Sequence, residues 1–204
     1  MVRVRLGDGM GTKSLVLAVA LPLLVGACTL SSTSSVVVDG TPVPSGPESP
    51  IEPRAFVRTC DTAVYGRLQK DWRDHATIVG PLALLPLPAY TTATPRTFDA
   101  RGGRYRGLKV LALVEPGPAV TVSVPGSLRQ RLSLLFDPTA FRSDGRFRVA
   151  DGEPVVRFRP CSMHRATQFN GGLIAAGPGC YALDIRTTGG PTRRIRFPLG
   201  GPCG

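Results

Sequence analysis

The stretch KVLALVEPGPAVTVSV, residues 109–124, carries the pattern that decides the fold prediction. The apolar segment KVLALV is followed by the turn-forming segment EPGP and then by AVTVSV, in which every second residue is valine. An alternation with a period of two puts the three valines on one face of a β-strand, and proline and glycine together form turns. The stretch therefore predicts two short strands joined by a tight turn.

The same alternation of short apolar segments and turn residues continues along the chain from about residue 54. Pro154 to Arg159 predicts a strand with Val156 and Phe158 facing inward and Arg157 outward. Roughly seven to nine such strands of about five or six residues are typical of an antiparallel β-sandwich of the immunoglobulin-like kind. Glycine (24) and proline (20) supply the turns and exclude a helical bundle. The further predicted strands are at 77–79 with 82–87, 130–136, 168–175, 181–187 and 193–198.

One segment has helical spacing. Val64, Leu68 and Trp72 recur every four residues after Asp61, which is a suitable N-cap, although Gly66 weakens a helix. We expect a short helix or a 3₁₀ segment that covers one end of the sandwich, with Trp72 in the core.

The N-terminus has the features of an export signal. Residues 1–27 carry three basic side chains and then the uncharged apolar segment LVLAVALPLLVGA, which is too short to span a membrane. The segment VGAC, ending at Cys28, resembles the lipobox of bacterial lipoprotein precursors. We expect cleavage before Cys28 and attachment of diacylglycerol to its sulfur, which holds the protein on the extracytoplasmic face of the membrane. A retained anchor helix and an ordinary signal-peptide cleavage are the alternatives.

Residues 28–53 are rich in Ser, Thr, Pro and Gly, a composition that predicts a disordered tether. The valine triplet at 36–38 leaves open a short edge strand in this segment. The remaining residues, 54–204, form the predicted β-sandwich domain.

Four cysteines remain after Cys28, and an even number in an exported chain predicts two disulfides. The predicted strands after residue 155 alternate in direction, which puts Cys161 and Cys180 at opposite ends of the sandwich and brings Cys203 to the end with Cys180. We therefore predict a Cys180–Cys203 bond and, by elimination, Cys60–Cys161. No CxxC or HxxxH spacing indicates zinc, and no metal site is predicted.

The chain is basic, with 25 Lys and Arg against 14 Asp and Glu and a formal charge of +11. Without residues 1–27 the charge is +9, because three basic side chains and one acidic one are removed. Such a charge indicates either a polyanionic partner (a phosphate-rich wall polymer, anionic lipid head groups or nucleic acid) or a high-GC composition with arginines scattered over a solvated surface. Nucleic-acid binding is not expected, since no recognition motif is present. The candidate ligand or polyanion contacts are Arg101, Arg104, Tyr105, Arg106, Arg157, Arg159, Gln168 and Asn170.

Gln168 and Asn170 precede two glycines and allow two interpretations. The first is a β-bulge in which Asn170-Gly171 adopts positive φ. The second is a polar patch, with charge from Arg157 and Arg159, where the glycines let a ligand or a neighbouring strand approach closely.

No catalytic residue or cofactor is predicted, because no GxSxG elbow and no predictable pair of acids is present. The two histidines are His75, which lies in a polar stretch, and His164. The order Cys161, Met163, His164 leaves a copper site as an alternative, but it lacks the usual spacing and needs a free Cys161. A secreted hydrolase is the other alternative.

The segments FVRTCDTAVYG, GPLAL, VLALVEPGPAVTVSVP and TQFNGGLIAAGPGCYALDI resemble an uncharacterised family of secreted actinobacterial lipoproteins. The third of these, with the later PGCYALDI, is also similar to strand pairs of immunoglobulin-like sandwiches. The resemblance spans most of residues 55–203, and it implies fold and location but no activity. The expected function is a lipid-anchored binding or structural module of the cell envelope. Its expected partners are membrane lipid through Cys28 and an anionic wall polymer or another envelope protein.

Overall fold

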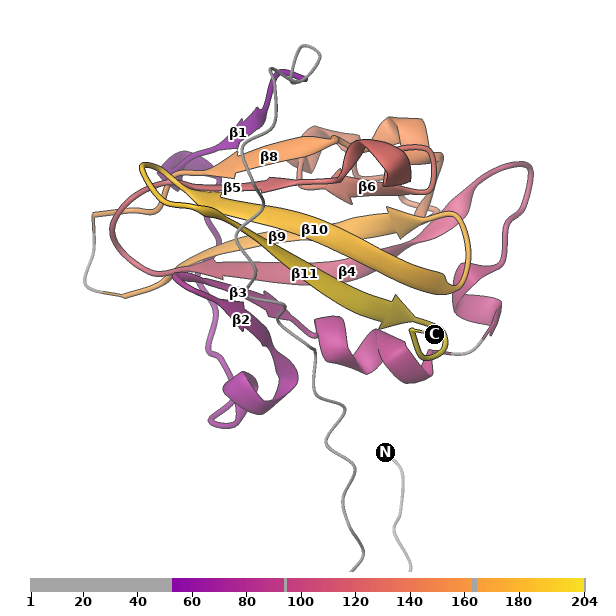
Figure 1. Ribbon diagram of the computed structural model, residues 1–204, viewed down its shortest axis with the longest axis horizontal. Helices are drawn as coiled ribbons and strands as arrows, with labels where there is room; N and C mark the ends of the chain where they lie inside the picture. Colours follow the sequence, from indigo (N-terminus) through magenta and orange to yellow (C-terminus); the bar gives the residue numbers. More distant parts are fainter. Residues whose placement is uncertain (1–52, 94, 163–164, 204) are drawn as a thin grey trace, which may run out of the picture. The chain divides into compact units, whose positions relative to one another are not determined.

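The computed structural model describes residues 53–93, 95–162 and 165–203 (Figure 1). The predicted signal peptide, Cys28, nearly all of the predicted tether and His164 lie outside the described residues. Within the described residues, no helix is both long and apolar enough to cross a membrane.

Two β-sheets form two layers of a sandwich (Figure 1). Sheet A contains, in spatial order, β1 (Phe56–Arg58), β8 (Val155–Phe158), β5 (Val120–Ser123), β10 (Gly179–Thr187) and β11 (Thr192–Leu199). Sheet B contains β2 (Thr77–Val79), β3 (Leu82–Leu85), β4 (Tyr105–Val114), β9 (Thr167–Ala175) and β6 (Leu132–Leu135). A two-residue strand, β7 (Arg146–Phe147), pairs with the start of β4.

The predicted antiparallel β-sandwich is confirmed. All strand pairs are antiparallel except β1 with β8, which run parallel. The EPGP turn connects β4 of sheet B to β5 of sheet A, so it crosses between the layers. The described residues contain eleven strands, more than predicted. The difference arises because β1 and β7 have only three and two residues, too few to show a period of two, and because the predicted strand at 77–79 with 82–87 is two strands, β2 and β3.

The core lies between the sheets and follows the predicted alternation. Val156 and Phe158 are fully buried on the inner face of β8, whereas Arg157 is on the outer face. The register of β10 and β11 places Leu183 opposite Ile195 and Phe197 opposite Tyr181.

The predicted bulge at Asn170-Gly171 is wrong, because β9 pairs with β4 in an unbroken register from Thr167 to Ile174. Gly171 and Gly172 instead allow neighbouring residues to approach the backbone of β9 closely. A Cβ on Gly171 would lie 2.2 Å from the Phe136 ring, and one on Gly172 would lie 2.6 Å from the Leu108 carbonyl oxygen. The neighbours that approach are therefore parts of the protein itself.

The helical segments of the described chain are all 3₁₀ turns. The segment with helical spacing has one such turn at each end and no helix between them. Trp72 is partly exposed rather than in the core, with the Arg73 guanidinium 4.6 Å from its ring centroid. The seven segments are η1 (Cys60–Thr62), η2 (Trp72–His75), η3 (Leu87–Thr92), η4 (Pro95–Phe98), η5 (Gly126–Leu128), η6 (Pro138–Ala140) and η7 (Val149–Asp151).

Both disulfides form with the predicted partners. Cys60 is bonded to Cys161 over a sequence separation of 101 residues, and Cys180 is bonded to Cys203 over 23. The first joins the chain just after β1 to the chain after β8, and the second ties the C-terminus to β10.

Arg58, at the end of β1, is completely buried (0% exposed) beside the first disulfide. Its Nη1 donates to the carbonyl oxygens of Phe136 and Asn170, the latter at 3.1 Å. Its Nε donates to Thr62 Oγ1 at 2.9 Å and its Nη2 to the Thr62 carbonyl oxygen. Burial lowers the pKa of the Arg58 guanidinium, and the Asp137 carboxylate opposes this shift. The Arg58 guanidinium nevertheless stays charged at neutral pH, because an arginine is not deprotonated in proteins.

The position of Arg58 explains why a charge is tolerated there. On one side of β9, strand β6 pairs only as far as Gly172, and the next backbone partner is Val64, which bridges to Gln168. The guanidinium fills the gap between them and satisfies carbonyl oxygens that no strand reaches. It links the edge strand of sheet A to sheet B.

Candidate functional site

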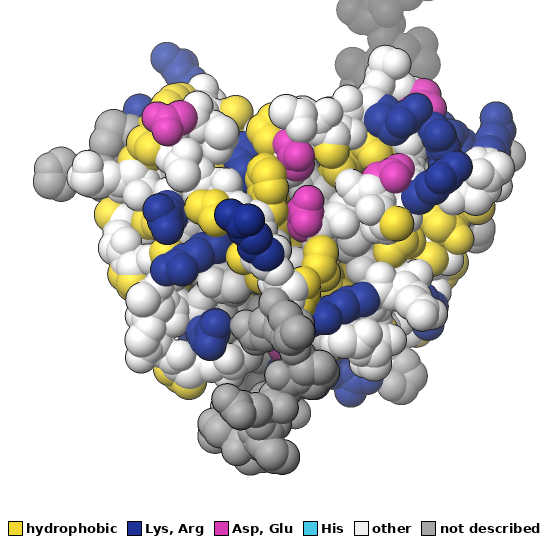
Figure 2. Space-filling model, turned by 90° about the horizontal axis from the view of Figure 1, so that it is seen from above, with side chains coloured by type: hydrophobic (Ala, Val, Ile, Leu, Met, Phe, Trp, Pro, Cys, Tyr) yellow, Lys and Arg dark blue, Asp and Glu magenta, His cyan; other side chains and the backbone are white. Residues whose placement is uncertain are grey.

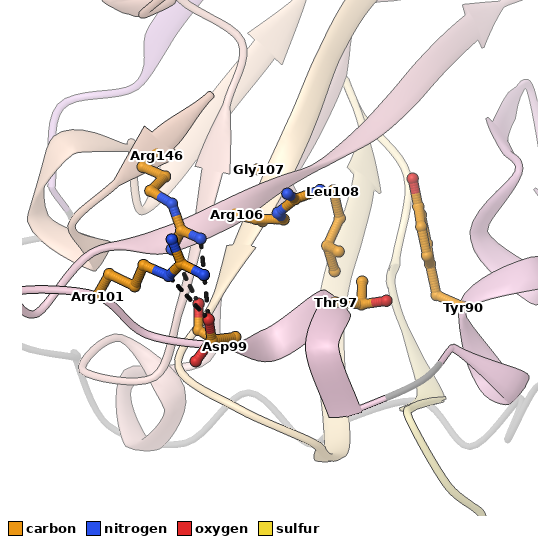
Figure 3. Close-up of a pocket in the computed structure, with 8 residues that line it drawn as sticks. All are labelled: Tyr90, Thr97, Asp99, Arg101, Arg106, Gly107, Leu108 and Arg146. Carbon is orange, nitrogen blue, oxygen red and sulfur yellow. Dashed lines mark hydrogen bonds and ion pairs between the residues drawn. The ribbon is translucent and has the colours of Figure 1, made fainter. Parts of the chain in front are cut away.

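A cavity of about 590 Å³ opens beside the first half of β4 (Figure 3). Residues from η3, η4, β4, β7 and the turn before β4 surround it. They are Tyr90, Thr97, Asp99, Arg101, Arg106, Gly107, Leu108 and Arg146.

The cavity lies where a neighbouring strand is missing. Strand β3 pairs with β4 only from Leu111 to Val114, and β7 pairs only with Tyr105 and Arg106, so the residues of β4 between these two pairings have no strand on that side. The η3 turn lies there instead, and the Tyr90 hydroxyl donates a hydrogen bond to the Lys109 carbonyl oxygen at 2.7 Å. Burial raises the pKa of Tyr90, so its hydroxyl stays protonated at neutral pH. The bond holds the ring as one wall of the pocket.

Asp99 is the acidic residue of the pocket lining, and two arginines share it. Arg101 Nε lies 3.4 Å and Arg146 Nη2 3.9 Å from Asp99 Oδ2, and Arg146 Nη1 donates to the Asp99 carbonyl oxygen at 3.2 Å. The Arg146 side chain is only 17% exposed. Packing and pairing therefore fix this end of the pocket.

Arg106 lies directly opposite Arg146 in the β4–β7 pairing. Within the described part of the chain, its guanidinium has no hydrogen-bond or ion-pair partner, and Figure 3 shows it near Leu108. Three guanidinium groups thus line a pocket that contains one carboxylate. The unbalanced charge and the unused donors of Arg106 suit an anionic ligand.

The adjacent turn adds further positive charge. Arg104 Nη1 lies 3.9 Å from Asp144 Oδ2, and Arg142 Nε lies 3.6 Å from Asp144 Oδ1. The pKa of Asp144 is lowered first by the Arg146 backbone N–H, which donates to its carboxylate, and then by these arginines.

The pocket has two chemically different ends (Figure 3). The ion-paired group of Arg101, Arg146 and Asp99 lies at one end and the Tyr90 ring at the other, with Leu108 and the Thr97 side chain between them. An anion attached to a ring or an apolar body matches this arrangement, since the ring can contact Tyr90 while the anion contacts Arg106.

The structure brings together only part of the predicted site. Arg101 and Arg106 line the pocket, and Arg104 lies in the adjoining turn. Tyr105 instead packs on the other side of β4 in a small cluster with Phe147 and Ile174. The pocket residues that the prediction omitted are Tyr90, Thr97, Asp99, Gly107, Leu108 and Arg146.

The second predicted patch is divided between the two sheets. Arg157 is on the outer face of sheet A, and Arg159 follows it. Gln168 and Asn170 belong to sheet B, where Gln168 Nε2 donates to the Gly66 carbonyl oxygen at 2.9 Å. These four side chains do not form one site. In Figure 2, Lys and Arg side chains form separate groups with acidic and apolar surface between them.

Among the described residues, no group of three His, Cys, Asp or Glu side chains could hold a metal ion. Cys161, which the copper alternative requires as a thiolate, is bonded to Cys60. His75 lies on the surface, with its Nε2 3.4 Å from Asp71 Oδ2.

Comparison of the chain with protein-family models, with curated proteins and with solved structures found no match.

Proposed function

We propose that this protein is a lipid-anchored binding module on the extracytoplasmic face of the cell membrane, and that its pocket holds an anionic group of an envelope ligand. The observation that carries the proposal is Arg106, an arginine in a cavity with no partner among the described residues, beside two arginines that share Asp99. The anionic wall polymer expected from the composition contains suitable groups, as do its fragments.

The lipid anchor is supported by the sequence VGAC at residues 25–28 and by the apolar segment before it. Two disulfides in the domain are consistent with an oxidising compartment. Cell fractionation tests the anchor. The wild-type chain should pellet with membranes, and Cys28→Ser should appear in the culture medium. A Cys28→Ser chain that still pellets would contradict the anchor.

Ligand class can be tested with three probes on the full chain: phenyl phosphate, inorganic phosphate and phenol. Phenyl phosphate presents an anion and a ring together, so calorimetry should rank it above inorganic phosphate and place phenol last. Arg106→Gln should weaken phenyl phosphate binding about ten-fold, the effect of one charged hydrogen bond. Arg67→Gln is the matched control, because Arg67 is exposed and does not line the pocket.

The probe series has a clear negative outcome. If Arg106→Gln and Arg67→Gln weaken binding equally, the arginines act only through the net charge of the chain. The pocket then has no specific role in binding.

A further inference from the structure

The outer face of sheet A is basic. Residues whose side chains alternate with the core positions point outward, and the register aligns Arg157, Thr121, Arg186 and Thr192 in a row across four strands. The neighbouring outward positions on β11 are Arg194 and Arg196, both exposed. Figure 1 shows β10 and β11 of this sheet in front of β9 and β4.

One acid lies among these arginines in the described strands of sheet A. Asp184 is the acidic residue in the five strands of sheet A, and Arg194 contacts both of its oxygens at 2.7 and 2.9 Å. This bidentate bond raises the pKa of Arg194. The outward positions between the arginines are occupied by residues with short side chains, such as Thr121, Ser123 and Ala182. The face is therefore polar and positively charged, and its side chains other than the arginines are mostly short.

The outer face of sheet B is different. Part of it is apolar, and Leu135 and Ile174 are buried there under Phe147 of β7. A basic face that extends over four strands is complementary to an extended anionic surface rather than to a small ligand.

The described chain begins at the edge of this same face. Val57 of β1 pairs with Arg157, and its side chain is 39% exposed because its neighbours Phe56 and Arg58 point inward. Twenty-five positions separate Cys28 from Pro53. Even fully extended, they span only about 85 Å. A lipid on Cys28 would therefore keep the domain within about 85 Å of the membrane surface without selecting the face that meets it.

We infer that the outer face of sheet A docks on the anionic lipid head groups of the membrane to which the protein is anchored. The inference rests on the proposed lipid anchor at Cys28. Each arginine near an anionic lipid surface contributes about a five-fold gain in binding. Docking fixes which side of the sandwich faces the membrane, whereas the tether alone leaves the orientation free.

Chemical footprinting of the lipidated full chain tests the inference. The protein is reconstituted in vesicles of neutral phosphatidylcholine, or of phosphatidylcholine with phosphatidylglycerol, and treated with an arginine-selective dicarbonyl reagent. Mass spectrometry then gives the modification rate at each arginine. Arg186 and Arg196 should react at least about five-fold more slowly in the anionic vesicles. Arg67 and Arg148, exposed residues of segments that lie against sheet B, are internal controls and should react equally in both.

Two double variants sharpen the test. Arg186→Gln with Arg196→Gln should abolish the protection of Arg159, which lies on the same side of sheet A. The matched variant, Arg67→Gln with Arg148→Gln, removes the same charge and should leave that protection intact. Salt at about 0.5 M should remove the protection, because it screens charges beyond a few ångströms.

Equal modification of Arg186 and Arg196 in both kinds of vesicle overturns the docking inference. Stronger protection by isolated anionic wall polymer than by anionic vesicles also overturns it and assigns the face to the polymer. Flotation with neutral vesicles in 1 M salt reports the anchor separately. If the protein does not float, the proposed anchor is wrong. The modification rates of Arg186 and Arg196 can then still be measured after the protein is mixed with anionic vesicles.

Discussion

Arg58 and Arg106 occupy two regions of the sandwich that treat a guanidinium in opposite ways. Neither is hydrogen-bonded to a carboxylate. Arg58 is fully buried, and all three of its nitrogens donate to oxygens of the protein. Arg106 is exposed in a pocket, and its nitrogens have no partner within the described chain.

The difference shows how an arginine used for structure can be separated from one available for binding. Burial alone does not decide, because a buried charge is tolerated when each donor is satisfied. The role of an arginine depends on whether the protein itself supplies acceptors for its N–H donors. At Arg58 the protein supplies the acceptors, and at Arg106 a ligand has to supply them.

The largest expected effect comes from opening the Arg58 region. Replacing both Cys60 and Cys161 by Ser releases a loop of about 100 residues, for which the chain-entropy model gives about 4.7 kcal/mol. The matched change at Cys180 and Cys203, which closes a shorter loop, should cost about 3.4 kcal/mol. Urea unfolding of both double variants measures the difference. A smaller loss at Cys60 and Cys161 than at Cys180 and Cys203 would contradict this ranking.

Arg58→Met should destabilise the protein by about 3 kcal/mol. The change leaves the carbonyl oxygens of Phe136, Asn170 and Thr62 without a donor in the interior, and each such group is costly. Arg106→Met is the control and should change the free energy of unfolding by no more than about 0.5 kcal/mol. Thermal unfolding of the two variants measures the contrast. Equal losses would mean that Arg106 is also structural.

The sequence predicts well what depends on short-range pattern. Strands such as 119–124 and 154–159 follow from alternation, and the disulfides follow from strand direction. Two of the pocket arginines, Arg101 and Arg106, were predicted because they lie in the densest basic segment. The burial of Arg58 could not be predicted, since two of its acceptors come from residues 78 and 112 positions away.

The rest of the pocket depends on long-range pairing. Arg146 reaches Asp99 because β7 pairs with the start of β4, and a two-residue strand has no recognisable period. Tyr90 reaches Lys109 because β3 ends early and leaves one side of β4 open. Neither event leaves a local signal in the sequence.

Asp99→Asn should strengthen binding of phenyl phosphate about three- to five-fold. The carboxylate competes with a ligand for Arg101 and Arg146, and removing its charge frees both guanidinium groups while the Asp99 carbonyl oxygen still accepts from Arg146. Calorimetry measures the affinity, and unfolding should change little because these ion pairs are exposed or partly exposed. A weaker affinity would show that Asp99 positions the arginines rather than competing for them.

The smallest expected effect is the difference in how the Arg106 pocket and the Arg58 region respond to salt. Between about 0.05 and 0.5 M salt, phenyl phosphate binding should weaken on the order of two-fold, because charges in an open pocket are screened. The loss of stability in Arg58→Met should stay constant over the same range, since the buried guanidinium is shielded from ions by the protein and its hydrogen-bonded partners are neutral carbonyl and hydroxyl oxygens. Titrations and urea unfolding at both salt concentrations give the two quantities. A salt-dependent loss at Arg58 would indicate that its charge is balanced through solvent, and the contrast with Arg106 would then be one of degree.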